Sequence, residues 1–364
     1  MPKIRVLVVD DSATARDHVV EILRGDPELE VVGEAEDGKC AIELCQALRP
    51  DVITLDMVLP VMSGVAITEY VMAYFPTPIL IVSASSNRGE LHKTYDALAA
   101  GAVDVFEKPH GTELDGAWER GLIATVKLVS RVRVITHIRG KLRSPRLASV
   151  SVASSVSGAS VETRARTAPK RIVTIGGSTG APAAMVEILR SLPQGFSIPI
   201  LLVIHIGIPF STAFAEWLDD QSTLRVRYAT DGEPLPTPGQ AGVLMAPPGF
   251  HLVVQRSKLR LTGDPERNSC RPSVDVLFES LAQEHGPETV ACLLTGMGRD
   301  GAAGLAALRN AGALTIAQDE ASSIIFGMPR EAIEMRAVDR VLSLDQIPVA
   351  LAAVAREMTP GSKV

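Results

Sequence analysis

The chain has 364 residues, of which 46% are hydrophobic and only 4% aromatic, and its formal net charge at pH 7 is −6. This length suits about two domains at the usual ~150 residues each, and the composition suits a globular protein with an aliphatic core. No apolar run approaches the ~18 residues that span a membrane, and the N-terminus lacks the apolar segment of a signal peptide. We therefore expect a cytoplasmic protein without membrane insertion.

The charge is unevenly distributed and divides the chain into three segments. Residues 1–127 carry 21 acidic and 11 basic side chains, residues 128–170 carry one and 9, and residues 171–364 carry 20 and 16. The basic middle segment is rich in Ser and Ala without a hydrophobic period, which is typical of a linker. Because it lacks interleaved aromatic residues, we do not expect it to bind nucleic acid. The predicted domains are residues 1–127 and 170–364, joined by a linker over 128–169.

The four cysteines show no metal-binding spacing. Cys40, Cys45, Cys270 and Cys292 form no C-x-x-C motif and have no histidine nearby in the sequence. This pattern predicts reduced, mostly buried thiols and not a metal site.

The first segment alternates short apolar runs with helical stretches. The runs are Arg5–Val9, Glu30–Glu34, Val52–Leu55, Ile79–Val82 and Val103–Phe106. Five such runs with helical crossovers predict a parallel, doubly wound α/β sheet.

Polar side chains follow four of these runs. Asp10 and Asp11 follow the first, Asp56 the third, Ser83 the fourth and Lys108 the fifth. Each has an ordinary explanation by itself, as a helix cap or a turn residue. The carboxyl ends of parallel strands meet at one edge, however, so we expect all five in one pocket. Three carboxylates there favour Mg²⁺, and an aspartate in such a pocket can be phosphorylated by metal-assisted transfer.

The last segment also alternates apolar runs with helical stretches. The runs are Ile172–Ile175, Ile200–Ile204, Val243–Ala246, Leu252–Gln255, Thr289–Leu294 and Leu314–Ala317. They predict a second doubly wound, mostly parallel α/β domain, with one β-hairpin near residues 243–262.

A glycine-rich turn, Gly176-Gly177-Ser178-Thr179-Gly180, joins the first of these runs to a helical stretch at Ala183–Leu192. This strand, turn and helix place Ser178 at the apex, as in the G-x-S-x-G motif that exposes a serine nucleophile. The same turn could also bind phosphate, or Ser178 could simply cap the helix.

A serine nucleophile needs a base and a group that orients the base. The C-terminal segment contains three histidines, His205, His251 and His285. Only His205 directly follows a strand, so we expect it beside Ser178. Asp300 closes a second glycine-rich turn, within Leu293–Gly301, before a predicted helix at Ala302–Asn310, where it could also act as a helix cap. Asp275 is the competing acid. We prefer Ser178, His205 and Asp300, an order along the chain that differs from that of α/β-hydrolases.

Residues 3–125 resemble the response-regulator receiver domain, which has a flavodoxin-like (βα)5 fold. The resemblance implies that Asp56 accepts a phosphoryl group from a histidine kinase and that Asp10 and Asp11 join it in holding Mg²⁺. The residues that would respond to the phosphoryl group are Ser83, Lys108 and the switch aromatic Phe106. Ser63 stands where that family often has Asp.

Residues 170–358 resemble the catalytic domain of the chemotaxis protein-glutamate methylesterase (CheB) family. The matching segments are Gly177–Gly180, His205, Arg271–Phe278, Leu293–Gly304 and Gln318–Arg330. The resemblance implies a Ser178, His205 and Asp300 triad, with Thr179 and Met297 lining the site. Two positions depart from the family pattern: Ile204 replaces a usual Gln, and Ala181 replaces a usual Gly.

The two resemblances together imply a phosphorylation-activated hydrolase in two-component signalling. It would hydrolyse glutamate γ-methyl esters on the cytoplasmic helices of chemoreceptors, release methanol, and deamidate receptor glutamines without a cofactor. The family also implies that the unmodified receiver hinders access to the catalytic site. We expect a monomer. One alternative is a non-catalytic phospho-switch whose C-terminal half is a binding module. Another is a phosphate- or nucleotide-binding enzyme, although G-K-[ST] and G-x-G-x-x-G are missing.

Overall fold

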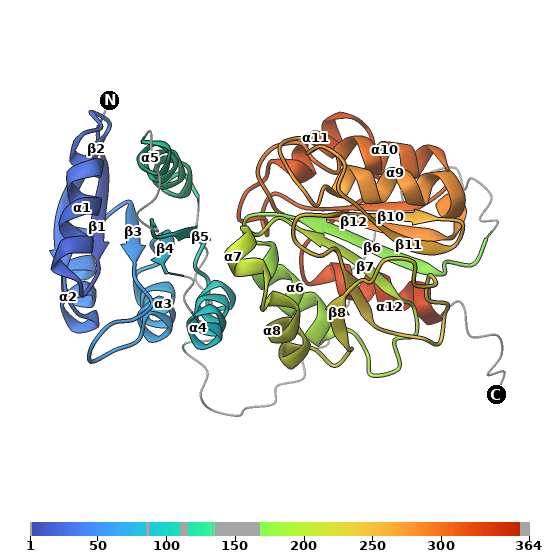
Figure 1. Ribbon diagram of the computed structural model, residues 1–364, viewed down its shortest axis with the longest axis horizontal. Coiled ribbons are helices and arrows are strands. Elements are labelled where there is room, and N and C mark those ends of the chain that lie inside the picture. Colours follow the sequence, from blue (N-terminus) through green and yellow to red (C-terminus); the bar gives the residue numbers. More distant parts are fainter. Residues whose placement is uncertain (1, 85–86, 110–115, 133, 135–167, 357–364) are drawn as a thin grey trace, which may run out of the picture.

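The computed structural model describes residues 2–84, 87–109, 116–132, 134 and 168–356, which form two α/β domains (Figure 1). Most of the predicted linker, residues 135–167, lies outside the described residues. In the part of the chain that is described, no helix has the length and apolar character needed to cross a membrane.

The N-terminal domain contains a five-stranded sheet in the order β2-β1-β3-β4-β5, with every neighbouring pair parallel. The strands are β1 (Ile4–Val9), β2 (Leu29–Ala35), β3 (Val52–Leu55), β4 (Ile79–Ser83) and β5 (Asp104–Glu107). This is the strand order of the flavodoxin-like doubly wound fold. The predicted fold is confirmed, and each predicted strand end lies within about one residue of the observed end.

Five helices connect and cover these strands. They are α1 (Ala13–Arg24), α2 (Gly38–Leu48), α3 (Gly64–Tyr74), α4 (Arg88–Ala99) and α5 (Ala117–Val129). Ser12, and not Asp10, accepts the capping hydrogen bond at the start of α1. Ser63 likewise caps α3. Because these serines satisfy the helix starts, the carboxylates at the strand ends are left for the pocket.

The C-terminal domain contains a seven-stranded parallel sheet in the order β14-β13-β12-β6-β7-β9-β8. Its strands are β6 (Ile172–Gly177), β7 (Ile200–Ile204), β8 (Val226–Tyr228), β9 (Val243–Met245), β12 (Thr289–Leu293), β13 (Leu314–Gln318) and β14 (Arg340–Leu342). The predicted hairpin is confirmed as β10 (His251–Gln255) and β11 (Lys258–Thr262), which pair antiparallel. The two edge strands, β8 and β14, were not predicted.

Helices cover both faces of this sheet (Figure 1). They are α6 (Ala181–Ser191), α7 (Ile208–Ser211), α8 (Phe214–Gln221), α9 (Val274–His285), α10 (Ala302–Asn310), α11 (Met328–Glu334) and α12 (Gln346–Arg356), with a 3₁₀ turn at Gly286–Glu288. The central strands β6, β7 and β12 are buried along their whole length. Two-sided burial explains their continuous apolar sequence.

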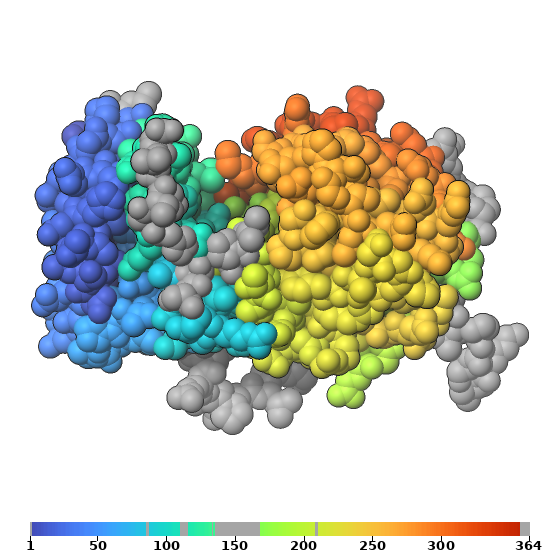
Figure 2. Space-filling model, in the orientation of Figure 1, coloured from blue at the N-terminus to red at the C-terminus, as the bar shows by residue number. Residues whose placement is uncertain are grey.

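The two domains meet where α4 of the receiver-like half packs against the second half (Figures 1 and 2). Tyr95 on α4 is fully buried, and its ring lies 5.3 Å from those of both Phe214 and Trp217 on α8. The Trp217 indole donates a hydrogen bond of 2.8 Å to Asp96 Oδ1. Aromatic pairs of this kind contribute roughly 0.5–1.5 kcal/mol beyond area burial, so this contact holds α4 against the C-terminal domain.

Candidate active site and its acidic pocket

Ser178, His205 and Asp300 follow three adjacent strands of the C-terminal sheet. Ser178 comes directly after β6 and His205 directly after β7, while Asp300 lies in the turn after β12. The His205 backbone N–H donates to the Gly177 carbonyl at 3.1 Å, which keeps the two strand ends in register. The structure therefore brings the three predicted residues to one edge of the sheet.

The turn at Ser178 leaves its side chain half-buried. Gly180 at φ +81° is the N-cap of α6, and no side chain caps that helix. The prediction that Ser178 could cap the helix is therefore wrong. Gly296 lies so close that an added Cβ would be 2.7 Å from the Ser178 Cβ. Only a residue without a side chain fits there, so Gly296 sets the space beside the hydroxyl.

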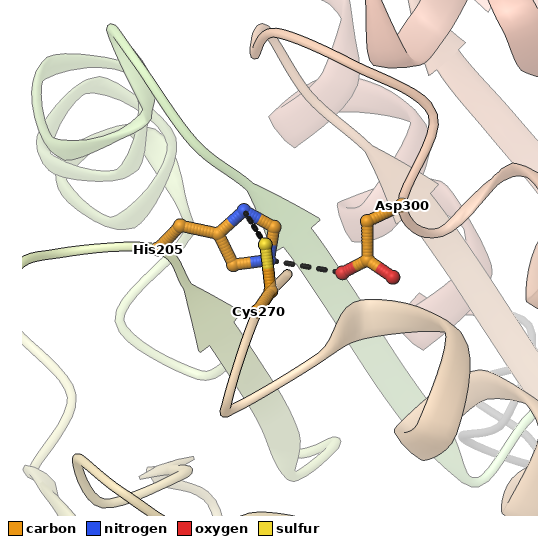
Figure 3. Close-up of side chains that lie close together, drawn as sticks. All are labelled: His205, Cys270 and Asp300. Carbon is orange, nitrogen blue, oxygen red and sulfur yellow. Dashed lines mark hydrogen bonds and ion pairs between the residues drawn. The ribbon is translucent and has the colours of Figure 1, made fainter. Parts of the chain in front are cut away.

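His205 Nε2 lies 2.9 Å from Asp300 Oδ2 (Figure 3). Asp300 is almost fully buried and also accepts hydrogen bonds from the Ser273 hydroxyl at 2.7 Å and the Val274 N–H at 2.6 Å. These donors belong to the start of α9, where the helix dipole favours negative charge. The sequence predicted that Asp300 could cap α10, but the N-cap of α10 is Gly301. The Asp300 carboxylate instead caps the start of α9.

The charges of this pair support each other. Burial alone would raise the pKa of Asp300, but hydrogen bonds from His205, Ser273 and Asn268 and the charge of His205 lower it to about 2. Burial alone would lower the pKa of His205, but its contacts with Asp300 and Cys270 outweigh burial and raise it to about 9. Asp300 therefore remains ionised at neutral pH, and its negative charge favours the protonated form of the His205 imidazole.

The competing residues have other partners. Asp275 accepts from the Gly304 N–H at 2.7 Å and from the Asn268 amide at 2.9 Å, and burial raises its pKa. His251 is buried, and its Nδ1 accepts from the Ser273 N–H at 3.1 Å. Asp300, not Asp275, contacts His205, and His251 instead supports the loop that carries Ser273.

Thr179 and Met297, the predicted lining residues, differ in their surroundings. The Thr179 hydroxyl donates at 2.8 Å to Asp104 Oδ2 on β5 of the first domain, so that domain touches the residue next to Ser178. Burial raises the pKa of Asp104, although the Thr179 hydrogen bond opposes this. Met297 is 57% exposed. Among the described residues, no hydrogen bond joins the Ser178 hydroxyl to His205.

Cys270 is a neighbour of His205 that the sequence analysis missed. Its Sγ lies 3.5 Å from His205 Nδ1, over the face of the imidazole ring, whose Nε2 binds Asp300 (Figure 3). Cys45 and Cys292 are buried as predicted, whereas Cys40 and Cys270 are half-buried. No histidine is near Cys270 in the sequence, but the fold brings it to His205, which lies 65 residues away along the chain; sequence spacing cannot detect such contacts.

The predicted acidic pocket forms at the carboxyl edge of the N-terminal sheet. Asp10, Asp11 and Asp56 each offer a ligand atom, and these atoms lie within 4.8 Å of one another. Lys108 Nζ lies 2.8 Å from Asp10 Oδ2 and 3.0 Å from Asp56 Oδ2. Burial raises the pKa of Asp56, although Lys108 opposes this effect. Three carboxylate ligands beside one another fit a hard cation such as Mg²⁺.

The other two predicted receiver residues line the same end of the sheet. Ser83 closes β4 and is buried. Phe106 on β5 is half-buried and packs against Trp118 with ring centroids 5.7 Å apart. A Cβ on Gly121 of α5 would come within 3.0 Å of the Phe106 ring, so the ring fills the space between β5 and α5.

Comparisons with known proteins agree with both halves of this architecture. The family model described as CheB methylesterase matches residues 173–351, and that of the response regulator receiver domain matches residues 6–115. The solved CheB methylesterase catalytic domain of Thermotoga maritima is 37% identical, with a TM-score of 0.48, and covers 51% of this chain and 98% of that chain.

Two curated relatives carry the name protein-glutamate methylesterase/protein-glutamine glutaminase over nearly their whole length. The Anaeromyxobacter dehalogenans protein is 42% identical over 98% of this chain and 97% of its own. The Nitrosospira multiformis protein is 42% identical over 97% of this chain and 98% of its own. The chain therefore belongs to the CheB protein-glutamate methylesterase family, with a response-regulator receiver domain before the catalytic domain.

Proposed function

We propose that this chain hydrolyses glutamate γ-methyl esters, and deamidates glutamines, on the cytoplasmic helices of chemoreceptors. The observation that carries the proposal is the His205–Asp300 hydrogen bond beside the Ser178 turn, in a chain whose relatives are named for these two activities. The ester and amide reactions share one acyl chemistry and differ in the leaving group, methanol or ammonia.

In this proposal Ser178 is the nucleophile, His205 the general base and Asp300 the residue that orients the base. Asp300 accepts from the Nε2 side of the ring, which leaves the Nδ1 lone pair to take the Ser178 proton. Catalytic hydrogen bonds are often long without substrate, so Ser178 and His205 would close on each other when the ester binds. The imidazolium then returns the proton to the leaving group.

The negative oxygen of the tetrahedral intermediate needs hydrogen-bond donors. The first turn of α6 offers backbone N–H groups without a side-chain cap, and the positive end of this helix points toward the Ser178 turn. Removing one such donor typically costs about 10²–10³ in rate. Met297 and Thr179 would border the bound ester.

The receiver would control access to this site. Asp56 would take a phosphoryl group from a histidine kinase, with Asp10, Asp11 and Asp56 holding Mg²⁺, which supplies charge neutralisation during the transfer. Lys108 is placed to compensate charge in the pocket. A phosphoryl group adds about two negative charges, which would shift the balance between the two domain arrangements and release Thr179 from Asp104.

A serine-directed fluorophosphonate tests the nucleophile directly. We expect one covalent label on Ser178, protection by a methyl-ester substrate, and no label in the Ser178→Ala variant. Labelling of a different serine with esterase activity retained in Ser178→Ala would contradict the assignment.

A further inference from the structure

The imidazole of His205 has two side-chain partners, Asp300 and Cys270. The ring binds Asp300 through Nε2 at 2.9 Å and meets the Cys270 thiol through Nδ1 at 3.5 Å (Figure 3). One ligand atom from each of the three residues lies within 4.8 Å of the other two. The proposed esterase mechanism uses His205 and Asp300 but gives Cys270 no role.

The backbone on which Cys270 lies is well fixed. Arg267 and Cys270 exchange two backbone hydrogen bonds, of 3.1 and 3.0 Å, across a tight turn. Its two central residues, Asn268 and Ser269, have φ of +53° and +59°, which is the conformation of a two-residue type I′ turn. Arg267 also binds Glu279 of α9 through two hydrogen bonds of 2.7 Å. The turn therefore fixes the backbone position of Cys270.

The distance between the two atoms suits a tetrahedral metal ion. With Zn–S of about 2.3 Å, Zn–N of about 2.0–2.1 Å and a tetrahedral angle, the sulfur and nitrogen ligands lie roughly 3.5 Å apart. Cys270 Sγ and His205 Nδ1 lie 3.5 Å apart. Because the sulfur lies over the face of the ring (Figure 3) and the Nδ1 lone pair lies in the ring plane, binding of one ion by both atoms requires the Cys270 side chain to rotate.

The outer side of the imidazole is also arranged as in metal sites. A histidine ligand usually donates its second ring N–H to a carboxylate, which fixes its orientation and raises its basicity. Asp300 is placed for this function at Nε2. Its oxygens already accept from Ser273 and Val274, so it acts as the outer partner and not as a ligand. Cys270 is half-buried, which leaves a path for an ion from solvent.

We propose that His205 Nδ1 and Cys270 Sγ form an inhibitory site for a thiophilic divalent cation such as Zn²⁺ or Cd²⁺, with water completing the coordination. On binding, the thiol and the protonated imidazole each release a proton to solvent, and sulfur and Nδ1 each donate a lone pair to the cation; no electron is transferred. The bound cation occupies the nitrogen that would take the Ser178 proton, so hydrolysis stops. The inhibition rests on the function proposed above, whereas the binding does not.

This site and the acidic pocket of the receiver differ in chemical softness. Sulfur and imidazole ligands favour zinc-like cations, while carboxylates suit Mg²⁺. Saturating Mg²⁺ therefore occupies the acidic pocket and leaves the His205–Cys270 site free for Cd²⁺, which makes the two sites separable in one sample.

The binding test follows the ultraviolet charge-transfer band of a cadmium–thiolate bond. Reduced full-length protein is titrated with Cd²⁺ in saturating Mg²⁺, together with Cys270→Ala, Cys270→Ser and the matched control Cys40→Ala, which removes the other half-buried thiol. We expect the band in the wild type and in Cys40→Ala, and at least tenfold weaker binding in both Cys270 variants. An undiminished band in the Cys270 variants, or none in the wild type, would overturn the site.

The inhibition test measures ester hydrolysis at buffered free Zn²⁺, with each protein compared with its own metal-free rate. We expect chelator-reversible inhibition of the wild type, and at least tenfold more Zn²⁺ for half-inhibition of Cys270→Ala. Equal sensitivity of the two proteins would overturn the proposal, and so would cadmium binding without inhibition. If no protein hydrolyses ester even with chelator, the proposed function has failed, and the charge-transfer band still decides whether the site exists.

Discussion

Replacing Asp300 by Asn tests the electrostatic core of the proposed site. The pKa of Asp300 falls from its ordinary value of 3.8 to about 2, and one pKa unit corresponds to ~1.4 kcal/mol. The surrounding donors therefore favour the ionised carboxylate by roughly 2 kcal/mol. An amide of the same size loses this charge and no longer stabilises the imidazolium formed in the transition state. By analogy with other serine triads, we expect kcat to fall on the order of 10³–10⁴-fold.

The pH dependence of the same variant has a definite sign. His205 must be unprotonated to accept the Ser178 proton, so wild-type kcat/KM should rise with pH through the raised pKa of His205, about 9. Without the carboxylate, burial of the imidazole still lowers its pKa, and one of the two contacts that raise it is lost. The rising limb of Asp300→Asn should therefore move to lower pH.

The assay is methanol release from a methylated receptor fragment between pH 6 and pH 10, in the presence of a chelator for thiophilic cations. Asp275→Asn is the matched control. Asp275 is a buried carboxylate in the first turn of α9, the helix whose start Asp300 caps, and it makes no hydrogen bond to His205. We expect this control to keep the wild-type pH profile. An Asp300→Asn enzyme with the wild-type profile and a rate within tenfold of wild type would refute the reasoning.

Three further changes give separate readouts. Ser178→Ala should lower turnover by about 10⁴–10⁶-fold, measured as methanol release, while Ser191→Ala at the exposed far end of α6 leaves it unchanged; equal rates would exclude Ser178. Asp56→Asn should keep the basal esterase rate but lose its stimulation by a small-molecule phosphodonor with Mg²⁺, and persistent stimulation would place the phosphoacceptor elsewhere. Asp104→Ala removes the hydrogen bond from Thr179 between the domains, worth ~1 kcal/mol. Unphosphorylated protein should then hydrolyse ester about fivefold faster, and an unchanged rate would remove this contact from the control of access.

The sequence predicted the two sheets largely because inner strands such as β3, β4, β6, β7 and β12 are buried along their whole length and read as continuous apolar runs. The short edge strands β8, at Val226–Tyr228, and β14, at Arg340–Leu342, lack that signal. Both have at least one exposed residue, and each is three residues long. The edge strands β2 and β5 of the first sheet are longer, at seven and four residues, and were predicted; three residues are too few for a local pattern to distinguish a strand from a loop.

The sequence predicted those residues of the candidate active site that follow strands. Ser178, His205 and Asp300 each follow a strand, so the rule that parallel strands end at one edge places them together. The supporting contacts come from residues 267–275, which lie on a loop and a helix start whose position depends on tertiary packing. For that reason the donors from Ser273 and Val274 to Asp300 and the Cys270–His205 contact could be found only in the structure.

The most direct test of the account measures methanol release from a methylated chemoreceptor fragment by the full-length protein, with and without phosphodonor and Mg²⁺. The account predicts slow release by the unmodified protein, faster release after phosphorylation of Asp56, and no release from Ser178→Ala. Phosphorylated protein that binds the fragment but releases no methanol would contradict the account and favour a non-catalytic binding module.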